Sequence, residues 1–254
     1  MALLEVDAIS LEFGGIRALD NLGFETEAGE ICALIGPNGA GKTTLFNCVS
    51  RVYTPQRGSI RFDGLELTHL PPHRVARAGI GRTFQNLALF PALSVLDNVR
   101  AGGYSRGSGG ALADALRLPG VGRRERRLRA EAMELLERLD LAHLAFRPAA
   151  DLPYGTLKRI EIARAMASRP RLLMLDEPAA GLTHSEVDEL GVTIRQLRSD
   201  FDLTVLLVEH HMSLVLAISD RVVVLDLGSK LAEGTAAEVV ADPLVVQAYL
   251  GVPE

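Results

Sequence analysis

The sequence has no tryptophan and few other aromatic residues, so aliphatic side chains must build its core. Aromatic residues make up 5% of the 254 positions, although hydrophobic residues as a whole make up 48%. A chain of this length can bury a sizeable interior, as one large domain or two small ones. We therefore expect a core built from leucine, valine, isoleucine and alanine.

Cysteine is also scarce, which excludes a framework of several disulfide bonds. The two cysteines, Cys32 and Cys48, lie in apolar stretches and do not have the spacing of metal ligands. Free thiols of this kind are typical of proteins from reducing compartments. We expect both to be buried and reduced.

The chain has neither a basic excess nor a long apolar run. Its net charge of −5 argues against a dedicated nucleic-acid-binding protein. No apolar run reaches the ~18 residues that a membrane-spanning helix needs. The first ten residues, MALLEVDAIS, lack the basic region of a secretory signal. We expect a cytoplasmic protein that works at a membrane only through another chain.

The apolar pattern predicts an α/β fold interrupted by a helical insertion. Residues 3–35 read as strands, among them the continuous apolar run ICALI, and residues 58–67 read as a hairpin that turns at Asp63-Gly64. After residue 166 strands and helices alternate, which predicts a parallel sheet. The expected elements there are strand 171–175, helix 185–198, strand 203–208, helix 212–218 and strand 221–226.

The middle of the chain has a different pattern. Residues 102–122 are rich in glycine and predict a loose connection. Residues 123–139 predict a helix with one apolar stripe. The stripe consists of Leu128, Ala132, Leu135, Leu136 and Leu139. The arginines at the start of this helix are interpreted as a solvated face, with contact to an anionic surface as the alternative.

The most specific motif is GPNGAGKTT at residues 36–44, which follows the ICALI strand and opens a helix. It fits the pattern G-x-x-x-x-G-K-[ST], whose backbone N–H groups surround a phosphate at a helix N-terminus. Lys42 would reach the β- and γ-phosphates, and the Thr43 hydroxyl would bind Mg²⁺. The glycine order does not fit the dinucleotide-binding pattern G-x-G-x-x-G.

A second motif, RLLMLDEP at residues 171–178, predicts a buried strand that ends in two acids. Ligands of open α/β sheets bind at that edge of the sheet. Asp176 would hold Mg²⁺ indirectly, and Glu177 would polarise a water in line with the γ-phosphate. A solvated strand end is the alternative, which the phosphate loop makes much weaker.

With these motifs in place, the chain resembles an ATP-binding cassette of the ABC transporter superfamily. The family's further motifs follow in the expected order: GRTFQN at residues 81–86, LPYGTLKRIEIARAM at 152–166, AAGL at 179–182 and VEHHM at 208–212. The resemblance covers nearly the whole chain and implies a P-loop NTPase, with a RecA-like parallel core, an antiparallel β subdomain and an inserted helical subdomain. It implies a core of residues 1–86 and 160–254, and an insertion of residues 87–159 that ends in the signature motif.

The resemblance also implies roles for individual residues. Glu177, His210 and Gln85 would act in catalysis, while Thr43, Gln85 and Asp176 would serve Mg²⁺, Asp176 through a water. Phe13 would stack on adenine, with a core position in a strand as the alternative, and Tyr154 and Gly155 would face the nucleotide of a partner chain. The phosphate loop would bind ATP through Gly36, Pro37, Asn38, Gly39, Ala40, Gly41, Lys42, Thr43 and Thr44.

The amino-acid sequences of several segments are similar to those of cassettes from branched-chain amino-acid importers. These segments include RTFQNLALFPALSVLDNV, LDEPAAGL and the terminal AYLG. Importers of urea or short amides and a lipopolysaccharide exporter are the alternatives. The implied partners are a second cassette, in a homodimer or heterodimer, permease subunits and, indirectly, a solute-binding protein. The implied location is the cytoplasmic face of the membrane, and no nucleic acid is involved.

The signature departs from the family pattern. Pro153 stands where many cassettes have serine, and Thr156-Leu157 stands where a glutamine is common. Since the signature completes the partner's ATP site, a nucleotide-gated subunit with weak hydrolysis is a second hypothesis. A third, a DNA-repair or chromosome ATPase of the same superfamily, is disfavoured because the insertion has no sustained heptads and no cysteine pairs.

Overall fold

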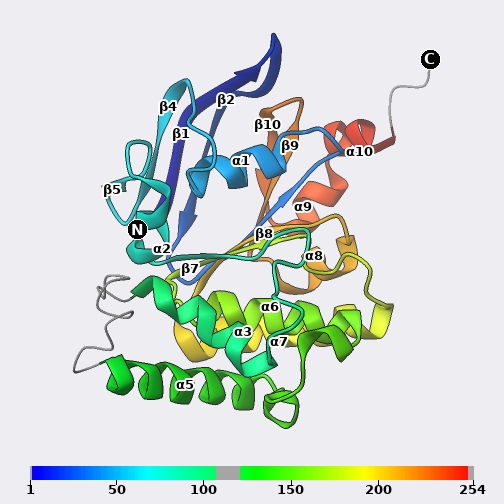
Figure 1. Cartoon of the computed structure of the whole chain (residues 1–254). Helices are drawn as coiled ribbons and strands as arrows, with labels where there is room; N and C mark the ends of the chain where they lie inside the picture. Colours follow the sequence, from blue (N-terminus) through cyan, green and yellow to red (C-terminus); the bar gives the residue numbers. More distant parts are fainter. Residues whose placement is uncertain (1, 107–120, 251–254) are drawn as a thin grey trace.

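Two β-sheets and a group of helices form the fold of the computed structural model, which describes residues 2–106 and 121–250 (Figure 1). The smaller sheet is antiparallel, with the strand order β2-β1-β4-β5. Its strands are β1 (Ala2–Phe13), β2 (Ile16–Glu27), β4 (Arg57–Phe62) and β5 (Leu65–Glu66). The predicted hairpin is confirmed: Asp63 and Gly64 form its turn, both with positive φ.

The larger sheet has the strand order β10-β9-β3-β8-β7-β6. All of these strands except β10 run parallel to one another. β10 (Ser229–Gly234) pairs antiparallel with β9 at one edge. The parallel strands are β3 (Ile31–Ile35), β6 (Ile80–Arg82), β7 (Leu172–Asp176), β8 (Thr204–Val208) and β9 (Arg221–Asp226). Every residue of β3, β7 and β8 is buried, which explains their continuous apolar sequences.

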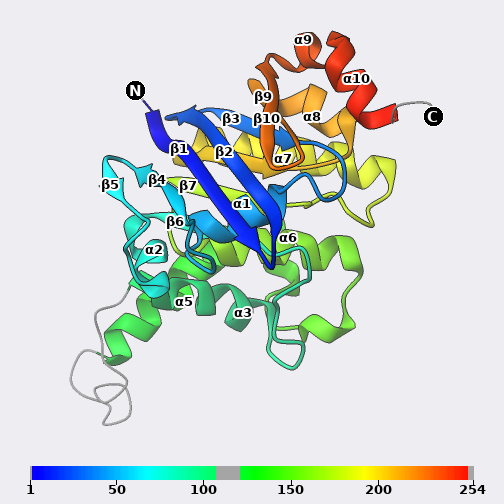
Figure 2. The same ribbon diagram turned by 90° about the horizontal axis from the view of Figure 1, so that it is seen from above.

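The larger sheet is covered on both faces (Figures 1 and 2). Between the two sheets lies α1 (Lys42–Val49), whose Phe46 is fully buried in a core shared by both sheets. Helices pack in a second core on the opposite face. They are α3 (Val95–Gly102), α5 (Val121–Arg138), α6 (Tyr154–Met166), α7 (His184–Phe201) and α8 (Met212–Ile218). A third apolar cluster lies under the C-terminal α9 (Ala236–Ala241), which α10 (Pro243–Leu250) follows.

The segment between β6 and β7 is helical. Its described residues form α3, α5, α6 and the short 3₁₀ helices Gly103–Arg106, Ala142–Leu144 and Ala149–Asp151. The predicted amphipathic helix is confirmed, and its apolar stripe is buried. Residues 107–120 of the predicted glycine-rich connection lie outside the described residues. The predicted boundary between residues 159 and 160 falls inside α6, which crosses it as one continuous helix.

A bulge in β1 explains why its apolar pattern changes phase. Val6 and Ile9 are both buried, although they are three residues apart. Between them the strand register shifts, and Ala8 adopts a left-handed conformation with φ of 48°. Such an extra residue moves the following side chains to the opposite face. Gly58 on β4 lies against this bulge, and a Cβ there would come within 2.3 Å of the Asp7 carbonyl oxygen.

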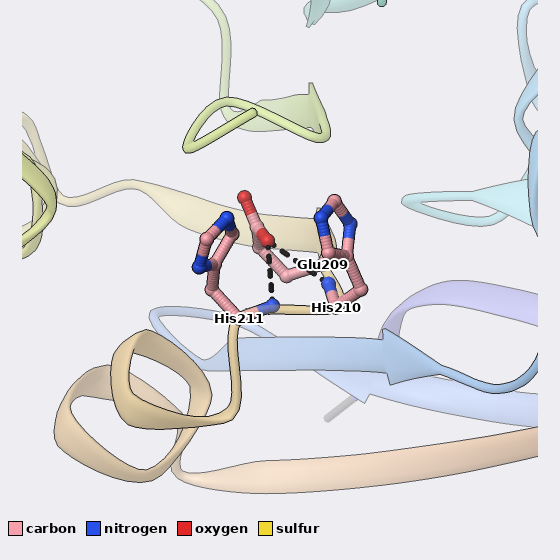
Figure 3. Close-up of side chains that lie close together, drawn as sticks. All are labelled: Glu209, His210 and His211. Carbon is pink, nitrogen blue, oxygen red and sulfur yellow. Dashed lines mark hydrogen bonds between the residues drawn. The ribbon is translucent and has the colours of Figure 1, made fainter. Parts of the chain in front are cut away.

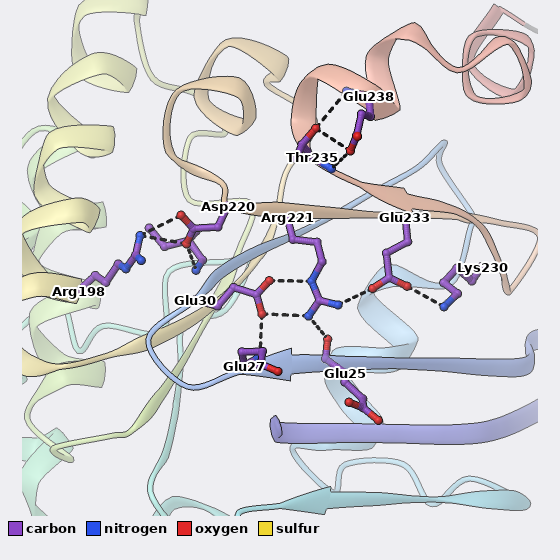
Figure 4. Close-up of polar contacts among 11 residues, drawn as sticks. Glu25, Glu27, Glu30, Arg198, Asp220, Arg221, Lys230, Glu233, Thr235 and Glu238 are labelled. Atoms are coloured by element: carbon purple, nitrogen blue, oxygen red, sulfur yellow. Dashed lines mark hydrogen bonds and ion pairs between the residues drawn. The ribbon is translucent and has the colours of Figure 1, made fainter. Parts of the chain in front are cut away.

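Arg221 links the two sheets at the start of β9 (Figure 4). Its guanidinium donates to both carboxylate oxygens of Glu30, at 2.6 and 2.9 Å, and to the backbone carbonyl of Glu25 on β2. It also pairs with Glu233 on β10. These carboxylates raise the pKa of Arg221, chiefly because Glu30 accepts hydrogen bonds from the guanidinium. A planar guanidinium can serve several acceptors at once, so one side chain joins three strands and a turn.

Both cysteines are free and buried, as the sequence predicted. Burial raises the pKa of the Cys32 thiol to about 12 and that of Cys48 to about 11, so both stay protonated and unreactive. Among residues 2–106 and 121–250, no helix combines the length and apolar character needed to cross a membrane.

Candidate nucleotide-binding site

The phosphate loop joins β3 to α1, and its glycines are needed for close backbone approach. Gly36 and Gly41 have φ of 150° and 100°, and Gly41 precedes the first residue of α1. A Cβ on Gly36 would lie 2.1 Å from the Leu225 carbonyl oxygen, and one on Gly41 would lie 2.5 Å from that of Ala18. Only glycine fits this path. The N-terminus of α1 therefore opens directly into the loop, as an anion site requires.

Lys42 lies inside the loop. Its ammonium donates to the carbonyl oxygens of Gly36, at 2.6 Å, and Pro37, at 3.0 Å. Burial lowers its pKa, and the nearby carboxylates of Glu177 and Asp176 partly offset this effect. The loop thus supplies a positive charge beside the two acids predicted from the sequence. Thr43 is exposed at the same helix start.

Asp176 ends β7 and is held by an arginine that the sequence reading did not assign to the site. The carboxylate is 1% exposed, and its Oδ2 accepts a hydrogen bond of 3.0 Å from Arg82 Nη2. Arg82 also donates to Asn47 Oδ1 and Ser50 Oγ, which fixes its position at the end of β6. Burial raises the pKa of Asp176, while the hydrogen bond and charge of Arg82 oppose the rise.

The other oxygen, Asp176 Oδ1, is buried and has no hydrogen-bond partner among the described residues. A buried carboxylate oxygen without a donor is costly, and magnesium sites commonly use such an oxygen through a bound water. The donor set of the exposed Thr43 hydroxyl, the Gln85 amide and this oxygen fits a hydrated Mg²⁺ ion.

Glu177 and Gln85 meet directly, although they are far apart in the sequence. Gln85 Nε2 donates to Glu177 Oε2 at 2.9 Å. Glu177 has a left-handed backbone with φ of 48°, which is uncommon for a residue other than glycine. The polypeptide thus turns sharply after Asp176, and the two adjacent acids have different partners.

Phe13 ends β1 and is 45% exposed, which argues against the alternative of a core position. Its ring packs edge-on against Tyr53, with centroids 5.1 Å apart. Two exposed aromatic rings in contact offer a surface on which a planar base can stack. The role of Phe13 toward adenine stays a prediction.

His210 follows β8 and is exposed beside His211, as Figure 3 shows. The buried Glu209 holds both residues through its carboxylate. Its Oε2 accepts from the backbone N–H groups of His210 and His211, at 2.9 and 3.0 Å, and its Oε1 accepts from Ala179 N at 2.7 Å. Glu209 therefore ties the histidines to the segment that follows Glu177. The contact of His210 with a γ-phosphate stays a prediction.

The signature motif begins α6, with Pro153 as its N-cap and no side-chain hydrogen bond there. A Cβ on Gly155 would come within 2.5 Å of Glu186 Oε1. Glu186 caps the start of α7 together with Thr183. Gly155 thus permits close packing within this chain, a reason for glycine that the sequence reading missed. Tyr154 is exposed. The approach of both residues to a partner's nucleotide stays a prediction.

Two further residues near the site were not found from the sequence. Lys158 is 2% exposed, and its ammonium donates to the backbone carbonyls of Gln85 and Glu177. Tyr249 on α10 has a pKa raised by burial and lowered in part by a backbone contact with Gly36. The AYLG segment that holds Tyr249 was noted in the sequence only for its resemblance, since no local pattern linked it to the phosphate loop.

The comparisons with known proteins agree with this geometry. The family model described as ABC transporter matches residues 19–180, which is more than half of the chain. The chain belongs to the ABC transporter family. A second model, described as branched-chain amino acid ATP-binding cassette transporter, matches residues 229–254 of this cassette.

Individual relatives match nearly the full cassette. The high-affinity branched-chain amino acid transport ATP-binding protein BraF of Pseudomonas aeruginosa is 44% identical, with 98% of each chain covered. LivG of Escherichia coli, of the same description, is 42% identical with the same coverage. A nucleotide-free cassette from an ABC transporter has a TM-score of 0.87 at 30% identity, with 99% of this chain and 100% of that chain covered. The predicted fold class and family are thereby confirmed.

Proposed function

We propose that this cassette hydrolyses ATP to energise the import of branched-chain or related amino acids. The observation that carries the proposal is its similarity, over 98% of its length, to ATP-binding proteins of high-affinity branched-chain amino acid transport. The C-terminal match to a model of branched-chain amino acid cassettes supports the same solute class. A urea or amide importer and a lipopolysaccharide-type exporter are the alternatives.

The phosphate loop, residues Gly36–Thr44, would hold the phosphates of ATP, and Phe13 would stack on its base. Mg²⁺ would neutralise charge between the phosphates, held by Thr43, by Gln85 and, through a water, by Asp176. Glu177 would polarise the attacking water, since its carboxylate lies beside Gln85 at the end of β7. His210 would hold the γ-phosphate from the end of β8.

A second cassette would complete the site, because the signature begins α6 in the helical core, whereas the phosphate loop opens α1 in the core between the two sheets. Permease subunits would bind near the loop after β6 that contains Gln85. This proposal is supported by a cleft of about 210 Å³ that Phe84, Ala88 and Gly102 help to line. The assembly would be peripheral on the cytoplasmic face of the membrane and would receive its solute from a binding protein.

One observation favours a second candidate function, a subunit whose signature supports only weak ATP hydrolysis at the partner's site. Pro153 provides no hydrogen bond at the N-cap of α6, where a serine hydroxyl would be available in many cassettes. The partner's γ-phosphate would then lose a donor. This cassette's own site has Lys42, Asp176 and Glu177 in place, so the effect would fall on one site of a heterodimer.

Glu177→Gln tests the proposed hydrolysis. Removing the carboxylate should leave ATP affinity within about twofold and lower turnover about 10²–10⁴-fold, the usual range for loss of a general base. ATP binding and phosphate release would both be measured on the purified protein. Glu137→Gln, an exposed position on α5, is the control. Turnover close to that of the parent protein would remove Glu177 from this role.

The solute is tested by uptake. Cells lacking this gene should import less radiolabelled leucine, and the intact gene should restore uptake while the Glu177→Gln gene should not. Urea uptake, measured in the same cells, distinguishes the alternative importer. If leucine uptake were unchanged and urea uptake were lost, urea rather than branched-chain amino acids would be the solute.

A further inference from the structure

The loop that contains Gln85 is bound along its backbone by one side of α6. This loop, residues 83–88 and called here the Gln85 loop, leaves the larger sheet after β6. Glu161 is 4% exposed, and its Oε1 accepts hydrogen bonds from the backbone N–H of Phe84, at 3.1 Å, and of Ala88, at 3.4 Å. A single carboxylate oxygen thus satisfies two backbone donors near the ends of the loop.

The neighbouring residues of the same row on α6 bind the loop's carbonyl groups. Lys158 donates to the Gln85 carbonyl at 3.5 Å, and Arg164 donates to that of Ala88. Lys158, Glu161 and Arg164 are spaced by three residues, which places them along one inclined ridge of the helix. Alternating charges on this ridge therefore match the donors and acceptors of the loop backbone.

Among the three ridge residues, Glu161 is the one that accepts from two backbone N–H groups of the loop. A backbone N–H that is shielded from water and has no acceptor is costly, so loss of this oxygen would release the loop at both amides. The Glu161 bond to Phe84 N, at 3.1 Å, is shorter than the two Lys158 contacts, at 3.4 and 3.5 Å. Gln85 lies between the two amides that Glu161 holds, and its side chain reaches Glu177 at 2.9 Å.

We propose that Glu161 is a positioning residue that fixes the Gln85 loop on α6 and so sets the contact of Gln85 with Glu177. Glu161 does not touch the reacting atoms. It acts by accepting two backbone hydrogen bonds, a task that needs an oxygen and not a charge. The consequence for hydrolysis rests on the proposed function, whereas the consequence for the loop does not.

Three substitutions separate the hydrogen-bond acceptor of Glu161 from its charge and from the length of its side chain. Glu161→Gln keeps the oxygen that accepts both bonds, Glu161→Met keeps a similar length without an acceptor, and Glu161→Ala removes the side chain. Glu137→Ala on α5 is the control for loss of an exposed glutamate. Thermal unfolding identifies any variant that fails to fold. If Glu161→Ala fails to fold, Glu161→Met still provides a variant without the acceptor oxygen.

Hydrogen exchange of the full chain, followed by mass spectrometry, is the first measurement. Exchange at the amides of Phe84 and Ala88 should become at least tenfold faster in Glu161→Ala and Glu161→Met, and should stay unchanged in Glu161→Gln and the control. Exchange in peptides from the phosphate loop should not change. Unaltered protection of the two amides in Glu161→Met would overturn the proposal.

Steady-state hydrolysis is the second measurement. Glu161→Met should lower kcat about tenfold with KM for ATP within twofold, and Glu161→Gln should keep kcat within twofold. If Glu161→Gln is as impaired as Glu161→Met, charge rather than hydrogen bonding is the function and the proposal is wrong. If the parent protein does not hydrolyse ATP, the proposed function fails, while the exchange experiment still decides the role of Glu161.

Discussion

At the residue scale, two adjacent acids at the end of β7 have different surroundings. Asp176 is buried and paired with Arg82, which leaves one carboxylate oxygen without a partner. Glu177 turns away through a left-handed backbone and meets Gln85. Asp176 therefore suits a fixed charge near a metal ion, whereas Glu177 can reach a water molecule.

Arg82→Met should lower the stability at neutral pH, where Asp176 is charged, and should lower the activity as the pH falls. Removing one partner of a buried ion pair commonly costs about 3–5 kcal/mol, because the remaining charge is unpaired. Since Arg82 opposes the effect of burial, its loss should raise the pKa of Asp176 further. A raised carboxyl pKa means that the ionised form is reached only at higher pH, so the acid limb of the pH–rate profile should move upward.

Urea unfolding and the pH dependence of ATP hydrolysis would test this prediction, with Arg123→Met as the control. Arg123 is exposed at the start of α5 and lies outside the site. An unmoved acid limb in Arg82→Met would show that Asp176 does not depend on this guanidinium for its ionisation.

At the element scale, α6 makes two sets of contacts. Its first turn packs against the segment before α7, where a Cβ on Gly181 would come within 3.1 Å of the Tyr154 ring. Its middle holds the Gln85 loop through Glu161. Because α6 is one helix of 13 residues, a shift of the signature would also displace the loop. The signature that we propose faces a partner and the Gln85 loop of this chain thus share one element.

Gly155→Ala should leave the protein less stable than Gly122→Ala by up to about 1 kcal/mol, the usual value of a helix cap, because displacement of the Glu186 side chain opposes the gain that alanine brings to a helix. The new Cβ would lie 2.5 Å from Glu186 Oε1 and would displace the side chain that caps α7. Gly122→Ala is the matched control, because no atom of the described residues comes within 4 Å of the added Cβ and the residue is helical. It should stabilise by about 0.5–1 kcal/mol.

Chemical denaturation of the two variants measures this difference. Equal stabilities would show that Glu186 adopts another rotamer at no cost, and that the close approach at Gly155 is not needed for folding.

At the scale of the whole molecule, the two sheets are joined by a buried core and by polar contacts around Arg221 (Figure 4). The phosphate loop lies between them, because Gly36 approaches Leu225 on β9 and Gly41 approaches Ala18 on β2. The acids are held from the larger sheet, by Arg82 on β6 and by Gln85 in the loop that follows it. The signature lies on the helical side, on α6. A chain built in this way carries a phosphate loop and a signature at different places, which suits head-to-tail pairing with a second cassette.

Pro153→Ser should raise hydrolysis at the partner's site, because serine restores an N-cap hydroxyl and a backbone N–H at the start of α6. In a heterodimer whose own site is inactivated by Glu177→Gln, the remaining turnover belongs to the partner's site and should increase. In a homodimer without that inactivation, both sites should gain. Pro148→Ser, at the N-cap of a short 3₁₀ helix, is the control. Unchanged turnover in both assemblies would make Pro153 a neutral variant.

Sequence alone determined the parts of this protein that depend on neighbouring residues. The phosphate loop, the acids after β7 and the amphipathic α5 follow from short patterns, because glycine conformation, strand burial and helix periodicity are local properties. The family followed from the order of such motifs. The bulge at Ala8 was visible only as a change of phase between Val6 and Ile9.

Tertiary structure decided which distant residues support these motifs. Arg82 reaches Asp176 across 94 positions, and Glu161 reaches Phe84 across 77. Glu209 holds Ala179, and Glu186 lies against Gly155. No local pattern contains these pairs, since a buried charged group finds its partner only when the sheets and α6 pack together. Tertiary packing therefore decided which residues position the site, whereas the local sequence decided which phosphate-binding and acidic residues the site contains.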